Sequence, residues 1–432
     1  MNAKLQKKFM NVYLFLDLFK MKKNVKDYVR DGKRIQEKRL HKLVKRAYQI
    51  PFYRKRFDEA GVRPEDIRTG DDLAKLPVLT KDELREWMSE EIQKPEYKDW
   101  IVDTTSGSTG KPLSIMMSPR EKAYMKANWL RVMLVCGYNP FTGKTMTRVN
   151  AHDENAGGRD TFLQRLGILR RAYLDQYAPE EELIEQINAY KPDFLYLNKS
   201  ELMRVVLYSK RTGTPVYHPK FYDPISERVS ENDRKLFIEV LGPGLVDAYG
   251  SAETGSCLLR LPGKKNYFMH YDSFVVNVID DYGRLADEGR LIITPLYKTD
   301  LPLINYQIGD SAVSKTKNGL RYVTDIKGRM NDYFYYENGE VTSFFEVTPV
   351  IAHCSDILQI RFIEETYDLI HVQIVRDENA KMSREEIEEY VSTNLNKIFK
   401  KPFAFEFEWL DVIPPDPNGK LRMIVSKVKP SV

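Results

Sequence analysis

The 432-residue sequence contains only three cysteines, and this scarcity excludes several classes of protein. Cys136, Cys257 and Cys354 lie far apart, so they cannot form the disulfide framework of a small secreted domain. No CxxC pair is present, which excludes a zinc ribbon, and no apolar run approaches the ~20 residues that span a bilayer. We therefore expect a reduced, soluble, cytoplasmic protein.

The proportions of hydrophobic and charged residues are those of an ordinary globular protein, but the charge is unevenly distributed along the chain. Hydrophobic residues make up 42% and charged residues 30% of the sequence, and the length allows two or three domains at ~150 residues each. The net charge is +5, but residues 1–46 alone contain fifteen Lys or Arg and four acidic residues. This basic arm therefore carries +11, and the remaining body carries −6. No nucleic-acid reader motif accompanies the arm, so we expect no nucleic-acid partner.

Five apolar residues of the arm recur at helical spacing and are flanked by lysines. They are Phe9, Val12, Tyr13, Leu16 and Phe19. The stretch lacks a small-residue cleavage site and contains Asp17, so it is not a signal peptide. Two interpretations remain. In the one we favour, this face docks on the body; in the other, it contacts an anionic surface at the inner face of the membrane.

The middle of the chain alternates helical and strand-like segments, which indicates α/β architecture. Thr80 is expected to cap a helix over 81–88, and a helix over 179–190 precedes a strand over 193–197. A further strand is predicted over 289–294. No internal repeat is present.

The last hundred residues predict a separate α+β domain. Strands are expected over 357–363 and 369–375. Ser383 and Glu386 form a capping box that opens a helix reaching about Lys400. The alternation of aromatic and other residues over 403–409 then predicts a strand with one buried face.

The most distinctive local motif is a hydroxyl- and glycine-rich segment that ends in a lysine. Its residues are Thr105, Ser106, Gly107, Ser108, Thr109, Gly110 and Lys111. Backbone N–H groups and hydroxyls in such a loop can surround a polyphosphate, and the lysine offsets its charge. The spacing is neither a Walker A loop nor a G-x-S-x-G nucleophile elbow. Taken alone, the segment fits a phosphate loop or a plain polar turn about equally well.

Four short motifs follow later in the chain. Each of them alone is weak evidence for a nucleotide site, because such turns are common. They are Asp247-Ala248-Tyr249-Gly250-Ser251-Ala252-Glu253, Tyr306-Gln307-Ile308-Gly309-Asp310, Gly328-Arg329-Met330-Asn331-Asp332 and Pro417-Asn418-Gly419-Lys420-Leu421-Arg422. In this order, they resemble the motifs of the adenylate-forming superfamily of acyl-CoA ligases, non-ribosomal adenylation domains and luciferases. Segments 50–56 and 76–81 are similar to the phenylacetate-CoA ligase family and its relatives in polysaccharide gene clusters. The resemblance covers about residues 40–428.

This resemblance implies a fold, a domain division and a reaction. After the basic amphipathic extension 1–46, it implies a large ATP- and acid-binding domain over 47–328, with mixed sheets and flanking helices. A small mobile α+β domain over 329–432 would follow. The implied enzyme is an AMP-forming acid–thiol ligase that uses ATP, Mg²⁺ and a small carboxylic acid, with CoA as the acyl acceptor. Transfer to a sugar amine or to a carrier thiol is the alternative, and a non-catalytic adenylate-binding protein is the alternative of another class.

The resemblance also implies roles for individual residues. The loop over 105–111 would hold the β- and γ-phosphates, and Glu253 would hold Mg²⁺. Lys420 would act between the attacking carboxylate and the α-phosphate. The remaining nucleotide-binding positions would be Asp247 and Tyr249 beside adenine, with Gly250 and Ser251, and Asp310 on the ribose, assisted by Arg329.

Four features depart from the family pattern or stay open. Asn331 stands at the hinge position, where relatives usually have Asp, and segment 333–340 differs from the usual CoA-contacting loop. The polar segment 150–155, with Arg148 close by in the sequence, favours a polar acid over phenylacetate. Cys257 and His270 lie thirteen residues apart, and we favour structural roles for both over a metal site.

Overall fold

The computed structural model describes residues 3–26, 28–104, 113–148, 162–175, 178–317, 320–329, 333–343, 346, 347, 350, 351, 354, 356–416 and 421–428. These residues form two compact units. The first comprises 1–137 and 248–328, and the second comprises 138–247 and 329–432. We describe each unit by itself.

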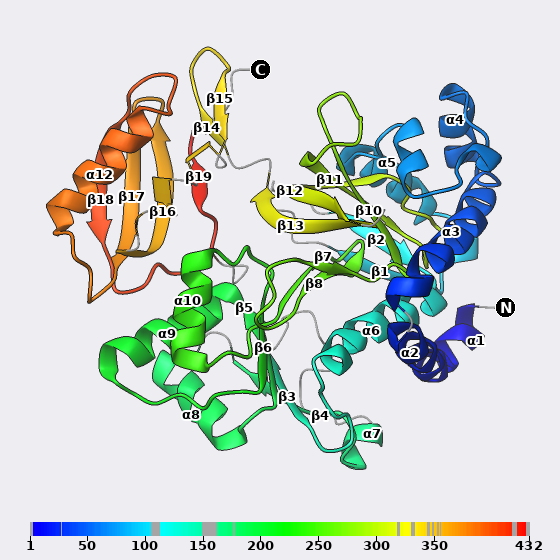
Figure 1. The fold of residues 1–432 in the computed structure, drawn as a ribbon, viewed down its shortest axis with the longest axis horizontal. Coiled ribbons are helices and arrows are strands. Elements are labelled where there is room, and N and C mark those ends of the chain that lie inside the picture. Colours follow the sequence, from blue (N-terminus) through cyan, green and yellow to red (C-terminus); the bar gives the residue numbers. More distant parts are fainter. Residues whose placement is uncertain are drawn as a thin grey trace. The chain divides into compact units, whose positions relative to one another are not determined.

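The first unit combines the N-terminal helices with antiparallel sheets (Figure 1). Its helices are α1 (Ala3–Lys8), α2 (Met10–Lys26), α3 (Tyr28–Ala47), α4 (Pro51–Glu59), α5 (Lys81–Glu91) and α6 (Pro119–Val135), with short 3-10 turns η1 (Pro64–Asp66), η2 (Asp71–Lys75) and η3 (Pro95–Tyr97). Its strands are β1 (Ile101–Thr104), β2 (Ser114–Met117), β7 (Asp247–Ser251), β8 (Gly255–Arg260), β9 (Phe268–Met269), β10 (Phe274–Ile279), β11 (Glu288–Pro295), β12 (Tyr306–Lys317) and β13 (Leu320–Arg329). The sheet orders are β1-β2, β7-β8-β9 and β10-β11-β12-β13.

The second unit contains a parallel sheet and a separate C-terminal sheet. Its helices are α7 (Phe162–Arg165), α8 (Glu180–Tyr190), α9 (Lys199–Thr212), α10 (Glu231–Leu241) and α12 (Arg384–Asn396). Its strands are β3 (Lys144–Arg148), β4 (Arg170–Leu174), β5 (Phe194–Asn198), β6 (Phe221–Ile225), β14 (Tyr333–Tyr335), β15 (Val341–Ser343), β16 (Ile357–Thr366), β17 (Leu369–Arg376), β18 (Ala404–Trp409) and β19 (Ile424–Ser426). The first sheet has the strand order β4-β3-β5-β6, and all its strands are parallel. The second sheet has the order β18-β17-β16-β19, and α12 packs against it.

Helix capping fixes several element starts where the sequence predicts them. The Thr80 hydroxyl accepts the N–H of Glu83 at 3.3 Å, and the Glu83 carboxylate accepts the N–H of Thr80 at 2.8 Å. Ser383 and Glu386 form the same capping box at the start of α12. That helix ends at Asn396, four residues before the predicted end, since Asn396 turns to bond Phe403 in the following segment.

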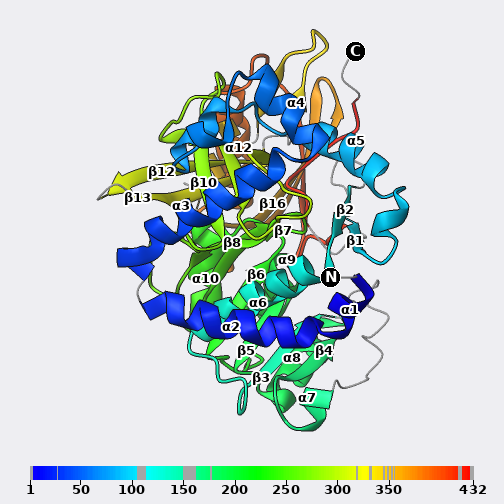
Figure 2. The same ribbon diagram turned by 90° about the vertical axis from the view of Figure 1, so that its right-hand side faces the viewer.

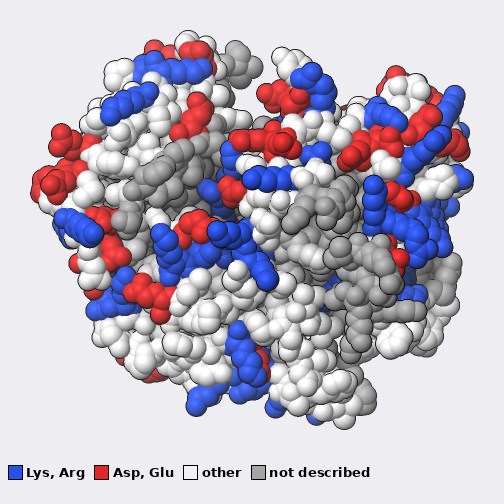
Figure 3. Space-filling view, in the orientation of Figure 1, with Lys and Arg blue, Asp and Glu red and all other residues white. Residues whose placement is uncertain are grey.

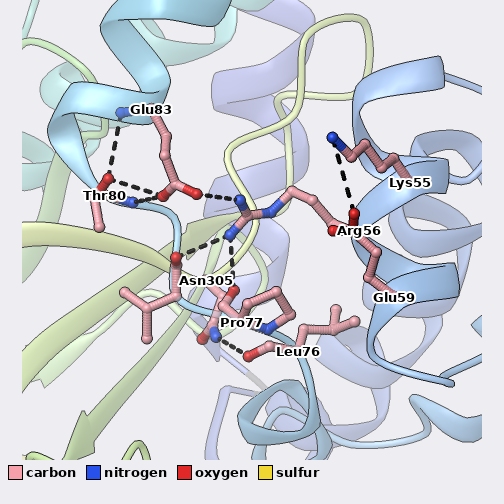
Figure 4. A network of polar contacts seen from close by, with 9 residues as sticks. Lys55, Arg56, Glu59, Leu76, Pro77, Thr80, Glu83 and Asn305 are labelled. Atoms are coloured by element: carbon pink, nitrogen blue, oxygen red, sulfur yellow. Dashed lines mark hydrogen bonds and ion pairs between the residues drawn. The ribbon is translucent and has the colours of Figure 1, made fainter.

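A polar network holds the segment that leads into α5 (Figure 4). Arg56 of α4 donates to the carbonyls of Pro77 and Val78 at 3.1 and 2.8 Å, and to the Glu83 carboxylate at 2.6 Å. From β12's side, the Asn305 amide donates to the carbonyl of Leu76 at 2.9 Å. A single guanidinium therefore ties α4, the 76–80 segment and α5 together, and this fixes where α5 begins.

The N-terminal arm packs on the first unit, but the predicted docking face is wrong. Asp17 is only 2% exposed and is ion-paired with Arg120 of α6, and Met21 is buried in the core beneath. Phe9 and Phe19, which we expected to dock, are exposed instead. The buried carboxylate and its arginine decide the helix rotation, because leaving either charge buried without its partner is costly. Among the described helices, none is long and apolar enough to cross a membrane.

Helix α3 is also an integral part of this unit. Leu40, Leu43 and Val44 belong to its main apolar core, and the Gln36 amide donates to the carbonyl of Phe274 at 2.7 Å. The polar face of α3 carries many of the arm's basic residues, and Lys and Arg side chains gather there at the right of Figure 3. The charge excess of the arm is therefore displayed on a helix whose other face is buried.

Candidate functional site

A tight strand–turn–strand in the first unit presents the candidate carboxylate. β7 and β8 are joined by Ala252, Glu253 and Thr254. Gly250 approaches the backbone so closely that a Cβ there would lie 2.1 Å from the carbonyl oxygen of Gly255. Any larger residue would open the turn. The glycine of this motif thus sets the position of the glutamate that follows it.

Glu253 is 4% exposed, and both of its described contacts use the same oxygen. The Tyr306 hydroxyl donates to Oε1 at 3.3 Å, and the Lys81 ammonium lies 3.8 Å from Oε1. Within the described part of the chain, Oε2 takes no such contact. A carboxylate held by one oxygen keeps its other oxygen available to a cation. Mg²⁺ typically binds one or two carboxylates and completes its shell with substrate phosphates and water, so this donor fits a magnesium ion.

Lys81 reaches Glu253 because two distant segments pair side by side. The Leu79 N–H donates to the carbonyl of Asn305 at 2.9 Å, and the Gln307 N–H donates to the carbonyl of Leu79 at 3.0 Å. This short parallel bridge places Lys81 beside Tyr306, and both side chains then meet the same carboxylate. Segment 76–81 was expected only as a family signature, and this contact of Lys81 was not predicted. The sole sign of it in the sequence is a lysine directly after the helix cap Thr80.

A second carboxylate lies on β12 and faces the aromatic residue of β7. The Tyr249 hydroxyl donates to the Asp310 carboxylate. Gly309, just before it, has φ +98°, a conformation that suits glycine. An ionised carboxylate offers about four acceptor positions, and hydroxyl groups such as those of a ribose are suitable donors to it. The structure thus brings together Tyr249 and Asp310, which lie 61 positions apart in the sequence.

Charged side chains lie near the start of α6, which follows β2 in the chain. Glu121 forms a capping box with Ser118 and accepts the N–H of Asp300 at 2.9 Å. Lys298 is 1% exposed; burial lowers the pKa of its ammonium, while the neighbouring carboxylates of Glu121 and Glu253 oppose that shift. On β1, Asp103 is ion-paired with Lys122. Charges of both signs therefore lie close to Asp103, on the strand that precedes residues 105–112.

Several predicted residues fall outside the described chain. Residues 105–112 lie between the paired strands β1 and β2, and neither this segment nor Asn331 nor Lys420 is described. Arg329 is the last residue of β13. Next to Lys420, the N–H of Leu421 donates to the Glu227 carboxylate at 3.1 Å, within the second unit.

Asp247 has a strong partner within the second unit. Its carboxylate accepts a hydrogen bond from the Arg234 guanidinium at 2.7 Å, and both side chains are largely buried. Ser251, at the other end of β7, contacts Thr254 through its hydroxyl at 3.2 Å. The ion pair with Arg234 thus anchors the start of β7. An adenine bound at this strand would meet an aspartate that already pairs with an arginine.

Cys257 on β8 and His270, directly after β9, are both buried, and the register of the two strands, continued by one residue, sets them opposite each other. The Cys257 thiol donates to the carbonyl of Tyr249 at 3.4 Å, and burial raises its pKa. Burial, followed by the charge of Arg131, lowers the pKa of His270 to about 3, so its ring is neutral at physiological pH. Among the described residues, no group of three or more His, Cys, Asp or Glu side chains could hold a metal ion. The structural roles that we favour for both residues stay a prediction.

Comparison with known proteins gives consistent relatives. The family description "CapK C-terminal domain" matches residues 334–427. A phenylacetate-coenzyme A ligase of Aromatoleum evansii is 28% identical over 323 residues, covering 69% of this chain and 70% of that protein. Protein CapK of Staphylococcus aureus is 24% identical over 384 residues, covering 83% and 81%.

Solved structures show the same architecture. A 2-hydroxyisobutyryl-CoA ligase, crystallised in the postadenylation state with 2-HIB-AMP, matches with a TM-score of 0.71. It is 17% identical, and the match covers 91% of this chain and 89% of that one. At this identity, the likeness concerns the fold. It confirms the predicted α/β class with mixed sheets, flanking helices and a small C-terminal α+β domain.

Proposed function

Because the chain belongs with the adenylate-forming enzymes, as a relative of phenylacetate-CoA ligase and of CapK, we propose that it activates a small carboxylic acid with ATP. The acid's carboxylate would attack the α-phosphorus, forming an O–P bond. The bond from that phosphorus to the bridging oxygen would break, and pyrophosphate would leave with the oxygen. An acyl-adenylate would remain.

The observation that carries this proposal is that two motifs of the first unit each present a carboxylate held by a tyrosine hydroxyl. Glu253 is anchored by Tyr306 and Lys81, and Asp310 is contacted by Tyr249. One carboxylate suits a metal–phosphate site and the other a ribose, as the family resemblance implies. The chemistry needs no general base, because the attacking carboxylate is already ionised; charge neutralisation and positioning supply the catalysis.

We assign the remaining nucleotide contacts by family resemblance. Residues 105–111 would surround the β- and γ-phosphates, and Arg329 would assist Asp310 on the ribose. Mg²⁺ held by Glu253 would neutralise charge on the phosphate oxygens. Lys420 would balance the charge that builds up at the α-phosphorus, and Asn331 would serve as the hinge of residues 329–432.

For the second step, we propose CoA as the acceptor. The thiolate would attack the acyl carbon, a thioester would form, and AMP would leave. The divergence of segment 333–340 keeps a sugar amine or a carrier thiol as the alternative acceptor. The similarity to CapK supports a place in capsular polysaccharide biosynthesis.

The test is pyrophosphate release from MgATP across a panel of acids, with and without CoA. We expect release with at least one acid, with polar hydroxy or amino acids exceeding phenylacetate, and AMP formation stimulated by CoA. Stimulation by an amino sugar instead would identify the alternative acceptor. ATP binding without pyrophosphate release for every acid would contradict catalysis and favour an adenylate-binding protein.

Asp310→Ala is expected to raise the KM for ATP about tenfold with a smaller change in kcat, because it removes hydrogen bonds made in both ground and transition states. Tyr249→Phe is the matched control, since it keeps the ring and the Asp310 carboxylate but loses the hydroxyl that joins them. Initial rates at varied ATP would measure both. An unchanged KM in Asp310→Ala would remove this carboxylate from the nucleotide site.

A further inference from the structure

An uninterrupted row of large apolar side chains lies exposed along α1 and α2. We call it the apolar stripe, and its members are Leu5, Phe9, Val12, Phe15, Leu16 and Phe19. Their exposed fractions run from 42% to 76%. Of the eleven large apolar side chains exposed in the described part of the chain, these six share one helical segment. Single exposed apolar residues are ordinary, whereas a contiguous row marks an interaction surface.

The stripe cannot turn inward, because the opposite face of α2 is already engaged. Asp17 is ion-paired with Arg120, and Leu14, Leu18 and Met21 pack against the core of the first unit. The Arg120 guanidinium also lies 5.1 Å from the centre of the Tyr13 ring. In Figure 2, no other labelled element lies in front of α1 and α2.

The sequence that carries the stripe is rich in lysine. Residues 3–26 contain seven lysines and a single acidic residue, Asp17, whose charge Arg120 already balances. Lys4 and Lys20 are exposed at either end of the stripe. A helix with an apolar face and lysines beside it binds in the plane of a bilayer interface, where anionic headgroups supply the opposite charge.

We propose that the apolar stripe is a docking surface for an anionic lipid bilayer, on which α1 and α2 lie parallel to the membrane plane. The charge distribution favours this occupant over a second copy of the chain. Residues 3–26 carry a net positive charge, so pairing two copies of this segment would bring like charges together, and these repel. A bilayer containing acidic lipids receives both the apolar side chains and the lysines.

The test is co-sedimentation of the full chain with vesicles of phosphatidylcholine alone or with 30% phosphatidylglycerol. We expect binding to the anionic vesicles, weakening as salt is raised. The triple substitution Val12→Ser, Leu16→Ser, Phe19→Ser should lower the partition coefficient about tenfold or more, since it removes three large apolar contacts. The matched control, Phe141→Ser with Leu166→Ser and Tyr282→Ser, alters exposed apolar residues off the stripe and should bind like wild type.

Three results would overturn the proposal. The first is no binding to anionic vesicles, and the second is equal binding by the triple variant. The third is a dimer, seen by light scattering, that the triple variant dissociates, which would assign the stripe to a second copy. Thermal unfolding of both variants should match wild type, because the substituted side chains are exposed. Pyrophosphate release in the absence of vesicles should also be unchanged, which separates this test from that of the proposed activity.

Discussion

Replacing Lys420 with alanine is expected to slow acid-dependent pyrophosphate release about 100-fold or more, while ATP binding stays close to wild type. In the proposed reaction, two anions approach each other at the α-phosphorus. A cation placed there interacts most strongly with the negative charge of the transition state. Its loss therefore lowers kcat more than it weakens ground-state binding of ATP. Quenched-flow or coupled pyrophosphate assays at saturating ATP would measure the rate, and titration with a fluorescent ATP analogue would measure binding.

The matched control is Lys427→Ala, which removes a lysine seven positions later. Lys427 pairs with Glu365 at 2.7 Å on an exposed surface, where such pairs contribute little. The control should retain normal pyrophosphate release. If Lys420→Ala matched it in rate, Lys420 would have no part in adenylation. A comparison of thermal unfolding would show that neither change acts through the fold.

The second large effect is expected for Glu253→Gln. This substitution should lower the rate of pyrophosphate release about tenfold to a hundredfold and raise the Mg²⁺ concentration that the reaction requires. Glutamine preserves the shape of the side chain and can still accept the hydrogen bond of Tyr306. What it removes is the negative charge that would hold the metal. Rates measured over a wide range of Mg²⁺ concentration should show partial recovery at high metal.

Tyr306→Phe separates metal binding from simple positioning of the glutamate. It removes the hydroxyl that contacts Oε1 but leaves the carboxylate charge in place. We expect a loss of only a few fold and a Mg²⁺ dependence near that of wild type. A Mg²⁺ dependence in Glu253→Gln identical to wild type would instead assign Glu253 a role in the β7–β8 turn.

The features predicted correctly from the sequence are those that neighbouring residues decide. The Thr80 and Ser383 capping boxes involve residues three positions apart, so the starts of α5 and α12 follow from the local sequence. The strand β18 follows equally from the alternation of Phe405, Phe407 and Trp409, whose rings pack against the C-terminal core. Periodicity and caps depend on residues a few positions apart, and the structure confirms the elements that they predict here.

The features that could not be predicted depend on distant partners. The rotation of α2 is decided by Arg120, 103 positions after Asp17, and periodicity alone favoured another face. In the same way, Lys81 meets Glu253 only because Leu79 pairs with the chain around Asn305. Neither contact has a signature in the surrounding sequence, because each partner could equally well be an ordinary surface residue.

The discontinuous first unit has a consequence for the order of events during synthesis. The apolar core that contains Leu40, Leu84 and Met117 is completed by Leu303 and Tyr306. At 5–20 residues per second, a ribosome needs roughly 10–40 s to pass from residue 117 to residue 306. During this interval the parallel strands β3 to β6, which lie between these two positions in the chain, are all synthesised. The core around the first hundred residues therefore stays incomplete until residue 306 has been made, and a chaperone that shields them during this interval should raise the yield of folded protein.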